Sequence, residues 1–341
     1  MKILVTGGSG FIGSAFIRKA VNELDYEIYN VDKITYASNE ESLKDIYSSS
    51  NYHFKKKDIN DTKEIEYIFK NFQPNALVHF AAESHVDNSI SSPEVFLHTN
   101  IIGTFSLLKE SLKYWNNLDK KEKNKFKFLH VSTDEVYGEL TTNEEPFTEK
   151  TPYAPNSPYS ASKASSDHLV RAWFETFKLP TVITHCSNNY GPFQNPEKFI
   201  PKIITNIIQN ETIPVYGSGQ NIRDWLYVED HVSALFELLT NNVCIGEKFN
   251  IGGNNEIKNL EIVNMVFDIF EKNNFKLKNQ NPRDLITYVD DRLGHDFRYA
   301  IDSSKIKQVI GWNAQRDFKK GLESTVEWYL DNKWWWEPLR K

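Results

Sequence analysis

KILVTGGSGFIG, at residues 2–13, is the stretch of sequence that decides the fold. Its first five residues form an apolar run that is typical of a buried strand, and helical character follows it as far as Leu24. Gly7, Gly10 and Gly13 lie between the two. Glycines at this spacing let the backbone turn tightly and approach a pyrophosphate, which then sits on the helix N-terminus. The stretch therefore predicts a doubly wound α/β fold that binds a dinucleotide.

Further strands are predicted by apolar runs that alternate with helical segments along the first half of the chain. The runs lie at residues 26–31, 52–56, 75–80, 128–131 and 181–185. Strands that alternate with helices favour a parallel, Rossmann-like sheet. The alternation then breaks down, so we expect residues 1–187, together with roughly 228–253, to form an NAD-binding Rossmann domain. Residues 188–341 should mainly form a smaller, interleaved, mixed α/β domain for the substrate.

The choice between NAD and NADP depends on the end of the second strand. Asp32 follows the glycines by about 20 residues, where a carboxylate accepts hydrogen bonds from the adenosine ribose. A carboxylate there should repel the extra phosphate of NADP, so we expect NAD. Lys33 leaves an alternative open, because a basic neighbour can bind that phosphate. Asp58 and Ile59, after the third strand, are placed to meet the adenine ring.

Groups able to do chemistry follow the strand at 128–131. Thr133, Asp134 and Glu135 come just after it, and ligands sit at the carboxyl ends of parallel strands. Asp134 and Glu135 would point oppositely in an extended strand, so the chain must leave strand geometry if both reach one ligand. Tyr159 and Lys163 are four positions apart, which a helix places on one face. A lysine ammonium there should lower the pKa of the phenol from about 10.

Composition and charge exclude several classes of function. The formal net charge of −6 argues against a general nucleic-acid binder. Two cysteines give no disulfide framework and favour a reducing compartment. The sequence shows no apolar run long enough to span a bilayer and no signal segment, so we expect no membrane contact and a cytoplasmic location. His85 has no Cys, His and carboxylate set around it, so no metal site is predicted.

Several longer motifs carry a resemblance over nearly the whole chain. They are AAESHVD at 81–87, STDEVYG at 132–138, SNNYGP at 187–192 and IRDWLYVED at 222–230. With the glycine motif and Tyr-x-x-x-Lys, they resemble the extended short-chain dehydrogenase/reductase superfamily. Within it the chain is most similar to the nucleotide-sugar 4,6-dehydratases that act on dTDP-glucose. The pair Asp134–Glu135 is the most discriminating feature, because related sugar epimerases and decarboxylases do not carry it.

The resemblance implies a lyase that converts a nucleoside-diphosphate hexose to its 4-keto-6-deoxy form, within deoxysugar or rhamnose biosynthesis. Tyr159 would take the proton of the sugar O4 while C4 gives a hydride to NAD, with Thr133 and Lys163 holding the phenol. Glu135 would remove the C5 proton, and a protonated Asp134 would donate to the departing C6 hydroxyl. NAD would be regenerated in each turnover and should stay bound.

The same resemblance implies the binding residues and the assembly of the protein. The predicted cofactor-binding residues are Gly7, Gly10, Phe11, Ile12, Gly13, Asp32, Lys33, Thr35, Asp58, Ile59, Phe80, Ala81, Ala82, Ser84, Thr99, Tyr159, Lys163 and Asn189. The predicted substrate-binding residues are Ser84, Asn188, Lys198, Phe199, Pro214, Val215, Tyr216, Arg223, Asn259, Arg292 and His295. The resemblance also implies a homodimer joined by helices at 95–115 and 160–178, whose apolar stripes allow such a seam.

Other readings of the sequence stay open at this stage. The same chemistry could act on UDP-glucose or UDP-N-acetylglucosamine, with or without epimerisation at C5. A nucleotide-sugar 4-epimerase would leave Asp134 and Glu135 without a role. A non-catalytic NAD-binding regulator would not need Tyr159 and Lys163, which are both present. A panel of nucleotide sugars would separate these readings, because only the dehydratases form a 4-keto-6-deoxy product.

Overall fold

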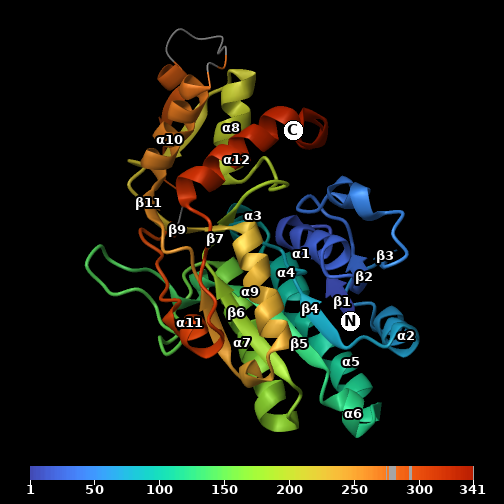
Figure 1. Cartoon of the computed structure of the whole chain (residues 1–341). Coiled ribbons are helices and arrows are strands. Elements are labelled where there is room, and N and C mark those ends of the chain that lie inside the picture. The colour runs from blue at the N-terminus through green and yellow to red at the C-terminus, as the bar shows by residue number, and fades with distance from the viewer. Residues whose placement is uncertain (274, 276–281, 292–293, 341) are drawn as a thin grey trace.

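A seven-stranded parallel sheet forms the centre of the molecule (Figure 1). The computed structural model describes residues 1–273, 275, 282–291 and 294–340 of the chain. The strand order is β10-β6-β5-β4-β1-β2-β3, which is the predicted doubly wound arrangement. The strands are β1 (Lys2–Thr6), β2 (Glu27–Asp32), β3 (Tyr52–Lys56), β4 (Ala76–His79), β5 (Lys127–Thr133), β6 (Thr181–Cys186) and β10 (Lys248–Ile251).

Helices cover both faces of the sheet, and the alternation of side chains along each strand explains why. Ile3 and Val5 of β1 belong to one apolar core, and Leu4 between them belongs to another. The first core includes side chains of α1 (Phe11–Asn22), α9 (Val228–Thr240) and α11 (Ser304–Ile310). The second includes α2 (Thr62–Phe72), α5 (Thr104–Asn117) and α7 (Pro158–Phe177). The strands are buried on both sides, as a parallel sheet requires.

The helix predicted at 95–115 is longer than expected and is interrupted. It consists of α4 (Pro93–Phe96), a π-helical segment η2 (Leu97–Gly103) and α5. π-Helical turns are rare and often lie at functional sites. This one contains Asn100, whose side chain accepts from the Glu83 N–H at 2.9 Å and donates to Ser162 Oγ at 2.8 Å. The segment therefore links the loop after β4 to α7.

A separate core lies in the C-terminal half and is called the C-terminal core below. It is built on two small sheets. The first sheet has the order β11-β9-β7, with β11 (Glu256–Lys258) antiparallel and β7 (Asn188–Tyr190) parallel to β9 (Ile222–Tyr227). The second pairs β8 (Ile213–Tyr216) with β12 (Ile286–Val289). Helices α8 (Phe199–Gln209), α10 (Asn259–Lys272) and α12 (Phe318–Asp331) pack with them. This is the predicted smaller mixed α/β part; the domain boundaries themselves stay a prediction.

The remaining elements are short. They are η1 (Glu40–Ile46), α3 (Val86–Ser91), α6 (Lys120–Lys123), η3 (Asp134–Tyr137), η4 (Asn242–Cys244), η5 (Pro282–Leu285), α13 (Lys333–Trp336) and η6 (Glu337–Leu339). No helix in the described part of the chain has the length and apolar character needed to cross a bilayer. Cys186 and Cys244 are both buried and are not joined to each other.

Candidate active site

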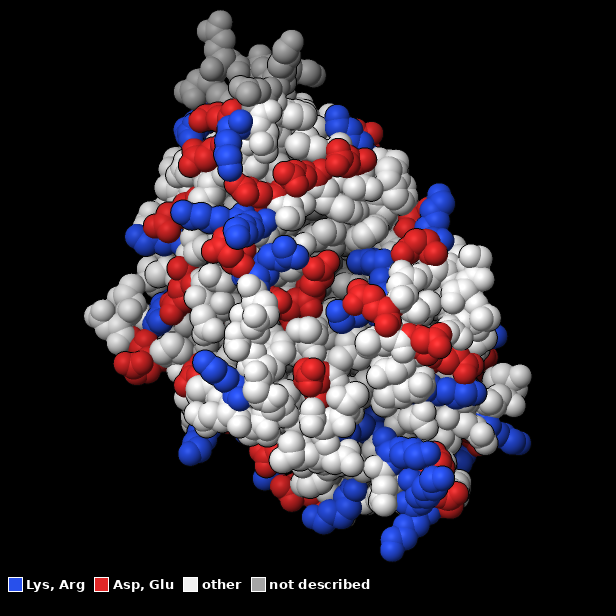
Figure 2. Space-filling view, viewed as in Figure 1, with Lys and Arg blue, Asp and Glu red and all other residues white. Residues whose placement is uncertain are grey.

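The carboxyl ends of the central strands open into a cavity of about 300 Å³. Its walls come from the ends of β2, β5 and β6, from the segments that follow β1 and β4, and from residues 188–198 of the C-terminal half. Figure 2 shows a hollow near the middle of the same face as Figure 1, with acidic and basic side chains around it. The fold thus brings together most of the residues that the sequence predicted for a cofactor and for catalysis.

The glycine turn after β1 fits a dinucleotide phosphate for steric reasons. Gly7 has φ +72°, and a Cβ there would lie 2.4 Å from the Ala81 backbone nitrogen. A Cβ at Gly13 would lie 2.4 Å from the Gly7 carbonyl oxygen. Gly10 is the N-cap of α1 and has no side chain to cap its first N–H groups, which are therefore available to an anion. All three glycines line the cavity.

The end of β2 presents a carboxylate that the backbone holds in place. Asp32 accepts hydrogen bonds from the Ser9 N–H at 3.0 Å and the Ile34 N–H at 2.8 Å. Burial raises the pKa of Asp32, and these two hydrogen bonds oppose the change. Lys33 lies beside it, with its Nζ 3.1 Å from Thr99 Oγ1 and 3.4 Å from a Glu83 carboxylate oxygen. The Lys33 charge is therefore already compensated by a carboxylate, which disfavours the reading in which it binds the phosphate of NADP.

The acid pair lies where β5 ends. The chain leaves strand geometry after Thr133 and enters the 3-10 turn η3, which confirms the prediction made from the side-chain directions. Thr133 caps this turn, since its Oγ1 accepts from the Glu135 N–H at 3.3 Å. The turn allows both Asp134 and Glu135 to line the cavity together with Thr133. One local change of backbone conformation thus directs two adjacent carboxyl groups to one space.

The surroundings of Asp134 favour its protonated form. It is 2% exposed, and its Oδ2 has no hydrogen-bond partner in the described part of the chain. Burial, with the nearby charges of Glu135 and Asp224, raises its pKa well above the usual value. Arg223 and the Thr133 hydroxyl act in the opposite direction but do not outweigh these effects. A neutral carboxylic acid in this position can donate a proton.

The prediction for Tyr159 is right about position and wrong about pKa. Tyr159 and Lys163 lie on α7 and both line the cavity, as expected. Burial and the charge of Glu135 nevertheless raise the Tyr159 pKa well above its usual value, against a hydrogen bond from Thr133. Lys163 does not lower it, since its Nζ donates to the Val131 carbonyl at 2.9 Å. Burial lowers the pKa of Lys163 itself, and the charge of Asp167 opposes that shift.

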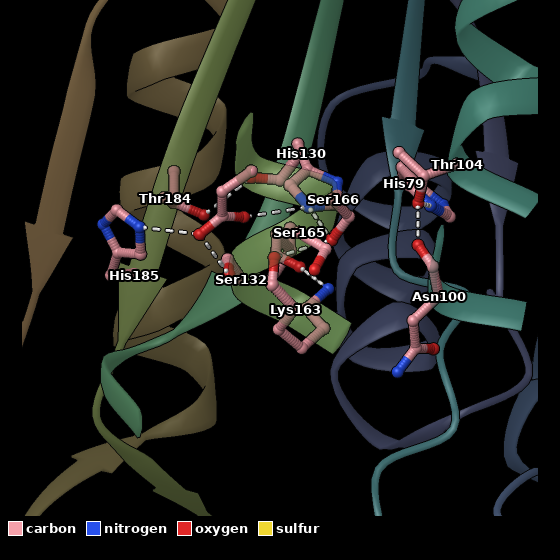
Figure 3. Close-up of polar contacts among 12 residues, drawn as sticks. His79, Asn100, Thr104, His130, Ser132, Lys163, Ser165, Ser166, Thr184 and His185 are labelled. Atoms are coloured by element: carbon pink, nitrogen blue, oxygen red, sulfur yellow. Dashed lines mark hydrogen bonds and ion pairs between the residues drawn. The ribbon is translucent and has the colours of Figure 1, made fainter. Parts of the chain in front are cut away.

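A buried polar network behind Lys163 was not predicted from the sequence (Figure 3). Asp167 accepts from Ser132 Oγ at 3.0 Å and contacts His185 Nε2 at 3.1 Å. His130 Nε2 lies 3.2 Å from the other carboxylate oxygen, without good hydrogen-bond alignment, and burial lowers the His130 pKa to about 4. Burial alone would raise the Asp167 pKa, but the two histidines outweigh it and hold the pKa below the usual range. The signal that could have revealed this network is a histidine inside each of two buried strands, His130 in β5 and His185 in β6.

Some residues that line the cavity were missed, and one predicted cofactor-binding residue lies elsewhere. The unpredicted lining residues include Ala37, Ser38, Lys57, Glu83, Cys186, Ser187, Gln194, Asn195 and Glu197. Most of them follow predicted strands, which is the signal that could have found them. Asp58 is not one of the described residues that line the cavity. Its Oδ1 accepts a hydrogen bond from the Asn60 N–H at 2.8 Å.

The predicted substrate residues divide into two groups. Ser84, Asn188 and Lys198 line the cavity. The others lie in the C-terminal half, outside the described walls of the cavity: Phe199, Pro214, Val215, Tyr216, Arg223, Asn259 and His295. Val215 is 1% exposed and packs in the C-terminal core, so only its backbone is left to contact a substrate. Arg292 lies outside the described residues.

Arg223 is a firmly held cation of the C-terminal half. Its guanidinium donates to the backbone carbonyls of Ile222 at 2.8 Å, Phe297 at 3.1 Å and Asp296 at 2.8 Å, and it lies 4.3 Å from the centre of the Tyr299 ring. Among the described residues, no group of three or more His, Cys, Asp or Glu side chains could hold a metal ion.

Comparison with known proteins gives consistent matches over the whole chain. The family described as GDP-mannose 4,6 dehydratase matches residues 4–325. A dTDP-glucose 4,6-dehydratase of Escherichia coli is 53% identical, with 99% of this chain and 96% of that protein covered. A crystal structure of dTDP-glucose 4,6-dehydratase from Bacillus anthracis in complex with NAD is 43% identical over 100% of both chains, with a TM-score of 0.87. The enzyme from Streptomyces venezuelae, also with NAD bound, is 39% identical over 100% of both chains, with a TM-score of 0.91.

Proposed function

Because this chain belongs to the GDP-mannose 4,6-dehydratase family, we propose that its cavity removes water from dTDP-glucose to give the 4-keto-6-deoxy sugar nucleotide. The chain is a hydro-lyase that uses NAD. The observation that carries the proposal is the turn η3, where Asp134 and Glu135 line the same cavity as Tyr159 and Lys163. A 4-epimerase needs the Tyr–Lys pair but has no work for two further carboxyl groups.

The residues at the cavity fit NAD. The glycine turn and the N-terminus of α1 would hold the pyrophosphate, and Asp32 would hold the adenosine ribose. Tyr159 and Lys163, on α7, line the same cavity, where the nicotinamide half would be bound. When bound, NAD accepts the hydride from C4 of the sugar and returns it to C6.

In the first step Tyr159 takes the proton of the sugar O4. This requires the phenolate, which burial and Glu135 disfavour in the protein by itself. The group that favours the phenolate in the protein by itself is the Thr133 hydroxyl, which hydrogen-bonds to it. The Lys163 ammonium, on the same helix, would support the phenolate once cofactor and sugar are bound. Asp167 opposes the loss of the Lys163 charge on burial, so that the ammonium is kept.

In the second step the acid pair divides its work. The ketone at C4 acidifies the hydrogen at C5, which Glu135 removes as a proton. Asp134 is neutral because of its burial, so it donates a proton to the C6 hydroxyl as water leaves. Glu135 then returns its proton to C5 when C6 has been reduced. Two neighbouring carboxyl groups with different environments suit these opposite roles.

The test is incubation of the purified protein with a panel of dTDP- and UDP-sugars, with products identified by mass and NMR. We expect dTDP-glucose to lose one water and give a 4-keto-6-deoxy product. A product of unchanged mass epimerised at C4 would replace the dehydratase with an epimerase. Faster conversion of UDP-glucose or UDP-N-acetylglucosamine would overturn the assignment of the base, and a product epimerised at C5 would add a step to the mechanism.

We also propose that the protein is a homodimer. The support is a set of exposed apolar side chains on the helices predicted for the seam, namely Val95, Leu97, Ile102, Phe105 and Phe177. Packing these helices against those of a second copy would remove that apolar surface from water. The cytoplasmic location predicted from the cysteine content stays a prediction.

A further inference from the structure

Part of the cavity wall belongs to a loop that contains Phe193, Gln194 and Asn195. Gln194 and Asn195 line the cavity, and Gln194 Nε2 donates to the Asn189 carbonyl at 2.9 Å. Asn195 Nδ2 donates at 2.9 Å to the carbonyl of Tyr36, which lies in the loop after β2. The loop therefore crosses from the C-terminal half to the cofactor-binding half at the edge of the cavity.

Phe193 holds the loop in an unusual backbone conformation. Its φ is +66°, in the left-handed region that side chains other than glycine seldom occupy, so its surroundings must fix it. One side of its ring faces the guanidinium of Arg18 on α1, at 4.0 Å from the ring centre. The rings of Trp328 and Trp335 also pack on it, with centres at 4.5 and 5.5 Å. Phe193 is thus held between the first and the last helices of the chain.

The C-terminal segment closes this arrangement. Trp335, in α13, is 3% exposed, and its indole Nε1 donates at 3.1 Å to Ser42 Oγ in η1, 293 positions away. Arg18 donates to the Ser42 carbonyl at 2.8 Å, and the Tyr329 hydroxyl donates to the Gln194 carbonyl. Burial lowers the Arg18 pKa to about 10, so its charge persists at neutral pH. In Figure 1 the C-terminus lies beside the blue N-terminal part of the chain.

We propose that Trp335 is a positioning residue that keeps the loop 193–195 closed over the cavity, through Ser42 and Phe193, and so slows the release of the dinucleotide. The inference rests on the proposed function, in which the hydride taken from C4 must be returned to C6 of the same sugar. Loss of NADH between these steps would strand a 4-keto-hexose. A closed wall is thus required by the chemistry, and the C-terminal segment supplies the contacts that close it.

Release of NADH can be measured directly, without any sugar. The protein is loaded with NADH and mixed with excess NAD, and the decay of NADH fluorescence gives the release rate. Trp335→Phe keeps a ring against Phe193 and removes the hydrogen bond to Ser42, whereas Trp335→Ala removes both contacts. The matched control is Trp334→Ala in the same helix, because Trp334 is 50% exposed and contacts η1 only through an exposed Lys44 at 5.4 Å among the described residues. Phe270→Leu, on α10 in the C-terminal core, controls for general destabilisation.

We expect release from Trp335→Ala to be more than about tenfold faster than from the wild type, because this variant loses the ring contact with Phe193 as well as one hydrogen bond, whose loss alone gives roughly 2- to 10-fold. Trp335→Phe should be intermediate, and both controls should match the wild type. During turnover Trp335→Ala should also leave free NADH and 4-keto-hexose in solution.

Equal release rates in Trp335→Ala and the wild type would overturn the inference, as would equally fast release from Phe270→Leu. A wild type that loses NADH during gel filtration would also overturn it. Failure to convert dTDP-glucose would instead refute the proposed function, since the release measurement contains no sugar.

Discussion

Replacing Asp134 by asparagine tests the division of roles between the two carboxyl groups with little disturbance of the fold. The side chain is 2% exposed, and burial raises its pKa, which favours the protonated form. In the proposed mechanism this form is the resting state, so an amide of nearly the same shape replaces a neutral acid. We expect the free energy of unfolding to change by less than about 1 kcal/mol, since no well-formed hydrogen bond is lost.

The chemical effect should be much larger and confined to one step. Asparagine cannot donate a proton to the C6 hydroxyl, and removal of a general acid typically costs about 10²–10⁴-fold in rate. Tyr159 and Lys163 remain in place, so oxidation at C4 should proceed. The variant should therefore accumulate NADH and a 4-keto-hexose that still carries its C6 hydroxyl.

The assay is stopped-flow absorbance at roughly 340 nm, where reduced nicotinamide absorbs, with product analysis after acid quench. NADH should form at the wild-type rate in Asp134→Asn and then persist, whereas it should be transient in the wild type. Wild-type dehydration should also fall as the pH rises through the raised pKa of Asp134, because only the protonated form donates. Loss of NADH formation in Asp134→Asn would refute the reasoning, as would a wild-type rate of dehydration.

Four further outcomes are expected. Glu135→Gln should reduce its bound NAD but stall before water leaves, whereas Tyr159→Phe should form no NADH; identical behaviour of the two in stopped flow would contradict the assigned steps. Asp167→Asn should lower the free energy of unfolding at pH 7 by about 1–3 kcal/mol, because buried groups lose hydrogen bonds to a charged carboxylate. Because the folded pKa of Asp167 is depressed, this contribution is present above the unfolded pKa and should fade in denaturation curves as the pH falls below about 4. A chelator should leave the activity unchanged; activity lost and then restored by a divalent ion would refute this. Ile102→Arg should convert the proposed dimer to a monomer in light scattering, and a wild type that is already monomeric would refute the dimer.

The sequence was sufficient wherever a function needs a local pattern. The glycine turn requires glycine at fixed positions, since a Cβ at Gly7 or Gly13 would collide with backbone, so spacing alone identified it. The strand before Thr133 and the i, i+4 pair Tyr159–Lys163 were equally local. Even the turn η3 could be predicted, because two adjacent carboxyl groups cannot reach one space from an extended strand.

Burial and long-range contacts were decided only by the tertiary structure. The pKa of Tyr159 is raised and not lowered, because desolvation depends on everything packed around the ring. The partners of Asp167 come from β5 and β6, and the partner of Trp335 lies 293 positions away in η1. Spacing within a helix or strand carries no information about such pairs, since they meet only when separate elements pack. The sequence by itself thus determined the fold class and predicted the cofactor site and the reacting groups, and the packing determined their burial and their long-range contacts.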